Sequence, residues 1–276
     1  MRPADAADQY LTTSDGVRLH YTDSAPAVVP GRASRTVLLF VPGWTMPGWI
    51  FAPQVAAFAP SYRVVVLDPR GQGDSDVAPS GYNQDRRGQD IAELIAQVGS
   101  ARVVLVGWSL GGLDSLAFIH SYGDAQLAGL VLVDISVGEN PPPVAARPAK
   151  PLHPAPRISR EAYMAGFVRS MFRRPQPQAY LDHLTQASLR TPEAAARQLL
   201  AYPVPRSYWK EAVYSTARPV LYIVRPGFAG QANNLAAHHP AAETVIIPDL
   251  GHAMFVDDPP RFDGIMQSFL ARRIGR

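Results

Sequence analysis

A serine flanked by glycines, in the run Gly107-Trp108-Ser109-Leu110-Gly111, is the side chain of this sequence best placed to act as a nucleophile. An apolar, β-branched run from Val103 precedes it, and a helix-compatible stretch from Gly112 to about His120 follows. A serine at the apex of a strand–turn–helix unit is held above the sheet, where the free N–H groups of the helix N-terminus point at the same spot. The two glycines lack a Cβ that would crowd the strained turn. We therefore predict that Ser109 is a catalytic nucleophile; the alternative is a plain turn between a buried strand and a helix.

Apolar strands alternate with amphipathic helices through most of the chain, and these elements must position the serine. We expect an N-terminal hairpin and six further strands, at Tyr10–Thr13, Val17–Asp23, Thr36–Val41, Tyr62–Leu67, Val103–Val106, Leu127–Asp134, Pro219–Arg225 and Thr244–Ile247. The expected helices are a short one through about Phe58, then Gln84–Val98, Gly112–His120, Gln231–His239 and Pro260–Arg272. Strands that alternate with helices at this spacing indicate an α/β fold with a mainly parallel sheet and helices on both faces.

The alternation breaks in the middle of the chain. The stretch Val137–Arg157 holds seven prolines and cannot be regular structure. Short amphipathic helices are expected after it, at about Ser159–Arg173, Pro177–Arg190, Pro192–Ala201 and Ser207–Tyr214. We predict that residues 137–216 form a helical lid, inserted into a core made of residues 1–136 and 217–276. A loose surface insertion is the alternative, but the aromatic residues of this segment are too apolar to sit in water.

The composition describes an ordinary globular protein and excludes several classes of function. The net charge is only +3, and no run of alternating basic and aromatic residues marks a nucleic-acid surface, so we expect no nucleic-acid partner. The absence of cysteine excludes disulfides, thiolate metal sites and cysteine nucleophiles. No HExxH motif, phosphate loop or dinucleotide glycine fingerprint occurs, so neither a metal nor a cofactor is expected.

No apolar run of about 18 residues occurs that could span a membrane, and the start MRPADAADQY lacks the apolar segment of a signal peptide. We therefore expect a cytoplasmic protein without a membrane span. Export after removal of a signal peptide is the alternative, because a trimmed chain would start in the same way. Nothing in the sequence indicates the oligomeric state.

Four motifs together resemble those of the α/β-hydrolase superfamily, over about residues 10–273. They are the serine turn; Val41-Pro42-Gly43-Trp44, where the superfamily usually has His-Gly; Leu67-Asp68-Pro69-Arg70-Gly71-Gln72-Gly73-Asp74-Ser75, similar to D-x-R-G-x-G-x-S; and Asp249-Leu250-Gly251-His252-Ala253, similar to a late Gly-His. The resemblance implies the α/β-hydrolase sheet with an inserted helical lid. The combination is specific for the fold and says little about the substrate.

The resemblance also implies the base that the serine needs, since a neutral hydroxyl is a weak nucleophile. His252 follows the last strand, at the place where the superfamily has its catalytic histidine. The other histidines fit worse: His20 falls in the first hairpin, His120 late in the helix after the serine, His153 and His183 in the insert, and His238 and His239 before the last strand.

The third member of the triad departs from the commoner pattern. Most relatives carry the orienting Asp just after the strand that here reads Val220–Val224, but no Asp or Glu occurs between Glu211 and Glu243. Some members of the superfamily place the acid one strand earlier, where this chain has Asp134. We therefore predict that Asp134 orients His252 and stabilises its protonated ring. Asp249 is the rival.

The superfamily pattern further implies an oxyanion hole from the N–H groups of Leu110 and Trp44. Pro42 replaces the usual histidine, so its fixed φ is expected to stiffen that loop instead. Trp108, Phe167 and Phe172 are expected to wall the substrate pocket, with core packing as the alternative.

Asp68 and Arg70 are expected to be a structural pair that holds their loop.

These residues predict a serine hydrolase that cleaves carboxylic esters of small molecules through an acyl-enzyme intermediate. The same triad also supports hydrolysis of C–C bonds, lactones, thioesters and carrier-protein esters, as well as perhydrolysis. The serine run is similar to that of the pimeloyl-carrier-protein methyl ester esterases, which points weakly to an acidic carrier partner. A ligand-binding receptor that retains the triad is the non-enzymatic alternative.

Overall fold

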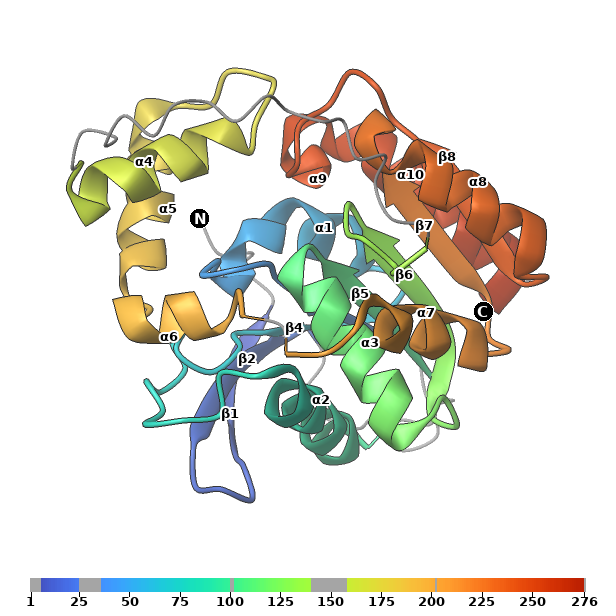
Figure 1. Ribbon diagram of the computed structural model, residues 1–276, viewed down its shortest axis with the longest axis horizontal. Coiled ribbons are helices and arrows are strands. Elements are labelled where there is room, and N and C mark those ends of the chain that lie inside the picture. Colours follow the sequence, from blue (N-terminus) through green and yellow to red (C-terminus); the bar gives the residue numbers. More distant parts are fainter. Residues whose placement is uncertain (1–5, 25–35, 100–101, 140–157, 202, 276) are drawn as a thin grey trace.

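An eight-stranded sheet in the order β1-β2-β4-β3-β5-β6-β7-β8 forms the centre of the computed structural model, which describes residues 6–24, 36–99, 102–139, 158–201 and 203–275 (Figure 1). The strands are β1 (Ala7–Thr12), β2 (Arg18–Asp23), β3 (Val37–Val41), β4 (Arg63–Leu67), β5 (Val103–Trp108), β6 (Leu127–Val133), β7 (Val220–Val224) and β8 (Ala242–Ile246). Each of the expected strands is present, with boundaries that differ by at most three residues.

The sheet is mainly parallel, as predicted. β1 pairs with β2 and β2 with β4 in antiparallel fashion, whereas the neighbours from β4 to β8 all run parallel. Every residue of β3, β5 and β7 is buried, because helices cover both faces and leave no strand face in contact with water. The carboxyl ends of these parallel strands meet at one edge of the sheet, where the serine turn lies.

Helices cover the sheet on both sides and continue into the segment between β6 and β7. They are α1 (Ala52–Phe58), α2 (Gln84–Val98), α3 (Leu110–Tyr122), α4 (Arg160–Ser170), α5 (Gln178–Leu189), α6 (Glu193–Gln198), α7 (Arg206–Ser215), α8 (Ala229–His238), α9 (Met254–Asp257) and α10 (Pro259–Phe269). Two short 3-10 turns, Gly48–Phe51 and Pro226–Phe228, and a π-helical turn, Leu270–Ile274, extend them. None of the helices in the described ranges is both long and apolar enough to cross a membrane.

Two apolar clusters fill the spaces between the sheet and its helices. α2, α3, α7 and α8 contribute to one cluster, and α1, α9 and α10 to the other. Successive residues of β3 alternate between them, since Leu39 belongs to the first cluster and Leu38 and Phe40 to the second. The sheet is therefore the middle layer of three.

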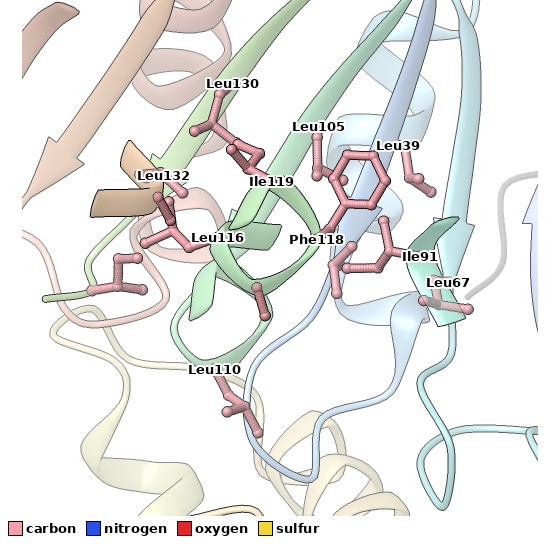
Figure 2. Packing of buried hydrophobic residues seen from close by; sticks show 14 of the residues in the cluster. Leu39, Leu67, Ile91, Leu105, Leu110, Leu116, Phe118, Ile119, Leu130 and Leu132 are labelled. Carbon is pink, nitrogen blue, oxygen red and sulfur yellow. The ribbon is translucent and has the colours of Figure 1, made fainter. Parts of the chain in front are cut away.

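The helix that follows the serine is embedded in the first of these clusters. α3 packs against both α2 and α7, and its Leu116, Phe118 and Ile119 lie over Leu105 of β5 and Leu130 of β6 (Figure 2). Because α3 is apolar on nearly all sides, its position is fixed by the burial of these side chains. The serine at its N-terminus is fixed with it.

The described part of the segment between β6 and β7 holds four helices, α4 to α7, close to the predicted ranges. α4 packs against α5, whereas α7 lies beside α3 of the core (Figure 1). Residues 140–157 of the proline-rich stretch lie outside the described residues. The division into a core and a lid at residues 137 and 216 stays a prediction.

Candidate active site

Ser109 stands at a sharp turn between β5 and α3. Its backbone has φ 53° and ψ −123°, a strained conformation for a side chain with a Cβ. A Cβ on Gly107 would lie 2.5 Å from the Cα of Gly112, and one on Gly111 would overlap the carbonyl oxygen of Val41. Both glycines are therefore required by the close approach of neighbouring backbone, which keeps the turn in place.

The loop after β3 lies directly against the serine. A Cβ on Gly43 would be 3.0 Å from the Cβ of Ser109, so Trp44, the next residue, lies close to it as well. Leu110 is the first residue of α3, where an N–H group has no carbonyl partner within the helix. The structure thus brings the two predicted oxyanion donors to the same side of the fold as the nucleophile.

Gln72 holds the loop after β3 in place, a role that the sequence analysis missed. Its fully buried side chain donates from Nε2 to the carbonyl oxygens of Gly43 (3.0 Å) and Met46 (2.8 Å). Arg87, which forms a buried 2.6 Å ion pair with Asp114 of α3, donates to the Oε1 of Gln72 at 3.4 Å. The loop after β3 is thus held by a side chain from the loop after β4.

His252 and Asp134 meet as predicted from the strand order. His252 Nδ1 lies 2.5 Å from Asp134 Oδ2, and the Asp134 side chain is fully buried while that of His252 is 19% exposed. Burial raises the pKa of Asp134, but the hydrogen bond and charge of His252, followed by those of Arg225, outweigh burial and hold that pKa below its usual range. Asp134 is thus an ionised acceptor for the ring N–H of His252.

Arg225 occupies the strand end that carries the acid in most relatives. Its backbone N–H donates to Asp134 Oδ1 at 3.0 Å, and its Nε donates to Asp134 Oδ2 at 2.6 Å. The sequence analysis identified this position only as lacking a carboxylate. The structure shows an opposite charge there, directed at the acid of the neighbouring strand.

Three contacts hold the loop that carries His252. Trp108 Nε1 donates to the carbonyl oxygen of His252 at 2.9 Å, Gly251 N donates to Asp257 Oδ2 at 2.7 Å, and Ala253 N donates to the carbonyl oxygen of Met171 at 3.0 Å. Trp108, which we expected in the substrate pocket, is only 1% exposed and packs against aromatic rings of the core. Its indole therefore acts on the histidine loop.

The remaining predicted pocket residues belong to the insert. Phe167 of α4 meets the Trp44 ring edge to face at 5.0 Å, and Trp44 Nε1 donates to the carbonyl oxygen of Ala196 in α6 at 2.7 Å. Phe172 packs against Tyr180 of α5 instead, with ring centroids 6.1 Å apart. Phe167 is thus in contact with Trp44 on the loop after β3, which we call the oxyanion loop because it carries a predicted oxyanion donor. The ring contact of Phe172 lies within the insert.

The rival acid points elsewhere. Asp249 forms an ion pair with Arg261, with both carboxylate oxygens 2.8–2.9 Å from Nη1, and its side chain is 56% exposed. Among the described contacts, Asp134 is the carboxylate on the ring of His252.

The expectation that Asp68 and Arg70 pair with each other is wrong. Arg70 is buried and binds Asp90 at 2.7 Å and Asp15 at 3.0 Å. Asp68 accepts a hydrogen bond from the ring of His20 at 2.7 Å and from the backbone N–H groups of Gly48 and Asp74. Each side chain therefore holds the loop through separate partners.

One group of side chains in the described residues has the spacing of metal ligands. His20, Asp68 and Asp74 offer ligand atoms that lie within 4.8 Å of one another. The Asp68 carboxylate already accepts three hydrogen bonds, so the cluster is explained by bonds among its own members and the nearby backbone.

Comparisons with known proteins agree with this architecture. A pimeloyl-[acyl-carrier protein] methyl ester esterase of Xanthomonas oryzae pv. oryzae is 27% identical over 256 residues, which cover 85% of this chain and 94% of that protein. A bifunctional esterase/perhydrolase of Acinetobacter calcoaceticus is 31% identical over 125 residues, 45% of this chain, and the match spans less than half of that relative's length, 43%.

The solved structure of an esterase from Exiguobacterium antarcticum superposes with a TM-score of 0.78, at 18% identity over 96% of this chain and all of that one, and shares its fold. The model of the alpha/beta hydrolase family matches residues 38–263, which include the serine turn, Asp134 and His252. The chain therefore belongs to the alpha/beta hydrolase family.

Proposed function

We propose that this protein is a serine hydrolase that cleaves carboxylic esters of small molecules through an acyl-enzyme intermediate. The observation that carries the proposal is the 2.5 Å contact of His252 with the buried Asp134, in a fold that presents Ser109 at a strained turn. A histidine oriented by an ionised acid is the base that activates a serine hydroxyl. The esterases among the relatives support the same reaction class.

The reaction follows from the roles of these groups. Ser109 Oγ attacks the acyl carbon while the His252 nitrogen that faces away from Asp134 takes the hydroxyl proton. The N–H groups of Leu110 and Trp44 stabilise the negative charge on the carbonyl oxygen. The alcohol leaves with the proton from His252. Water, deprotonated by His252, then attacks the acyl-enzyme and releases the acid.

The insert forms the lid of this site in our proposal. Trp44 contacts Phe167 of α4 and the backbone of Ala196 in α6, and these contacts support an apolar surface of the insert beside the acyl group. An apolar wall of this kind fits an ester with an aliphatic or aromatic acyl or alcohol part.

A panel of p-nitrophenyl esters of rising chain length tests the proposal, with Ser109→Ala as the blank. We expect repeated turnover by the wild type, loss of at least about 10³-fold in kcat in the variant, and one fluorophosphonate label per chain that is absent from the variant. Labelling that persists in Ser109→Ala would refute the assignment of the nucleophile. A single slow burst without turnover would favour a ligand receptor. Activity on thioesters or lactones alone would show that the substrate is not a simple carboxylic ester.

A further inference from the structure

The end of β7 carries a positive charge at the place where relatives have the catalytic acid, and that charge contacts the acid which this chain uses instead. We propose that Arg225 is a positioning residue that shares one oxygen of Asp134 with His252 and so weakens the hold of Asp134 on the protonated histidine. The consequence is an enzyme that keeps its activity at a lower pH. The inference rests on the proposed triad.

The geometry places both donors on the same atom. Arg225 Nε lies 2.6 Å and His252 Nδ1 2.5 Å from Oδ2 of Asp134, while the backbone N–H of Arg225 takes the other oxygen at 3.0 Å. The backbone bond does not depend on the side chain at position 225. A substitution there removes the charge and leaves the second anchor of the carboxylate in place.

The competition between the two donors depends on the protonation state of His252. When the ring is neutral, the guanidinium alone balances the buried carboxylate. When the ring gains a proton, two cations face one oxygen, and their mutual repulsion offsets part of the attraction to Asp134. The Arg225 side chain is 41% exposed, so water and salt reduce this repulsion without removing it.

The other charged and titratable groups on the surrounding elements have partners of their own within the described contacts. They are Tyr222 on β7, whose hydroxyl donates to the carbonyl oxygen of Ile135; Asp257 of α9, which accepts from the backbone of Gly251, Arg173 and Arg174; the Arg174–Asp258 pair; and the Asp249–Arg261 pair. None of these groups shares the Asp134 carboxylate with His252 in the described contacts. Arg225 is therefore the group to change.

The test is the pH profile of kcat/KM for a p-nitrophenyl ester in the wild type, Arg225→Gln, Arg225→Lys and Arg261→Gln. In Arg225→Gln we expect the acid limb to move to higher pH by about half a unit to one unit, with a smaller loss of kcat on the plateau than in Asp134→Asn. Arg225→Lys keeps a charge but not the fixed Nε contact, so the acid limb of its pH profile should also move to higher pH, but by less than that of Arg225→Gln. Arg261 is a matched control, because its side chain is 42% exposed and also pairs with an aspartate, and its replacement should leave the limb in place.

The outcomes separate this inference from the proposed function. A wild type that neither turns over esters nor accepts a fluorophosphonate contradicts the function itself. A wild type that is active, with an Arg225→Gln limb that stays in place or moves to lower pH, overturns the role of Arg225. An equal fall in rate at all pH values together with a lower Tm means that Arg225 only stabilises the fold, which also overturns it. If Arg225→Gln does not fold, the acid limb of Arg225→Lys decides: a move to higher pH supports the role of Arg225, and no move or a move to lower pH overturns it.

Discussion

Asp134 combines a buried carboxylate, a backbone with positive φ and two side-chain hydrogen-bond donors. Its carboxylate is fully buried, its backbone has φ 51°, and it accepts hydrogen bonds from both His252 and Arg225. A positive φ is strained for most residues but is tolerated by Asp and Asn. The strain persists because the packing around the end of β6 determines it, and it aims the carboxylate at the histidine loop.

Asp134→Asn should therefore leave the fold intact and reduce catalysis. Asn fits the same backbone conformation and has the same shape, so we expect Tm to change by no more than a few degrees. The amide cannot stabilise the protonated ring and favours the wrong tautomer of His252, so kcat should fall by about 10³–10⁴ while KM stays nearly constant. Steady-state kinetics and thermal melts measure both quantities.

Asp249→Asn is the control for this substitution, since Asp249 lies close to His252 in the sequence but binds Arg261 at the surface. It should retain most of the wild-type kcat. If Asp134→Asn keeps more than about a tenth of the activity while Asp249→Asn loses it, the acid is misassigned. If both variants stay active, the enzyme works with a Ser-His dyad.

At the scale of elements, the two phenylalanines of the insert have different neighbours. Phe167 contacts the oxyanion loop through Trp44, whereas the ring contact of Phe172 is with Tyr180 inside the insert. Phe167→Ala should therefore change the ratio of kcat/KM between short and long esters by up to about tenfold for each 1.4 kcal/mol of lost contact. Phe172→Ala should shift all esters by a similar, smaller factor. If neither variant changes this ratio, so that all esters shift by the same factor, the insert contributes stability alone.

The elements themselves could be predicted from the sequence because their signals are local. Buried runs such as Val103–Trp108 read as strands, and the 15-residue helix α2 starts after a capping Asn83 and ends at Gly99, which has φ 68°. The four-residue helix α9 was missed, since so short a segment has no periodicity to detect.

The contacts of the site were less predictable, because they depend on how distant segments align. Arg225 reaches Asp134 because β6 and β7 pair with Val133 opposite Ile223, which brings the two strand ends to the same level. A shift of this register would separate them, and no local pattern specifies it. Gln72 was missed for a related reason: its partners Gly43 and Met46 are backbone carbonyls, which carry no signal in the sequence.

At the scale of the whole molecule, a buried carboxyl group makes stability depend on pH. Asp263 of α10 is 8% exposed, and burial raises its pKa to about 6, although a hydrogen bond from Gln54 opposes the shift. The folded state thus keeps this proton to a higher pH than the unfolded state does. The contribution of Asp263 to stability is therefore largest below about pH 4 and decreases as the pH rises to about 6.

Asp263→Asn should remove this dependence. The Asn side chain stays neutral and can still accept from Gln54, so the difference in Tm between variant and wild type should be smallest at about pH 4 and grow to about 2–6 °C in favour of the variant at pH 8. Calorimetric melts at several pH values measure it. Asp182→Asn, on the exposed face of α5, should show no such trend. A difference in Tm that is constant from pH 4.5 to pH 8 would contradict the prediction.

The hydrogen bond from the Trp44 indole to the backbone of Ala196 has a consequence for how such enzymes diversify. Trp44, the proposed oxyanion donor of the loop after β3, is anchored in α6, so in our proposal the insert and the core share one part of the catalytic apparatus. Recombination that exchanges the whole insert with that of a relative would therefore alter transition-state stabilisation together with substrate choice. We therefore expect single substitutions on α4 to change substrate choice with less effect on turnover than exchange of the whole insert.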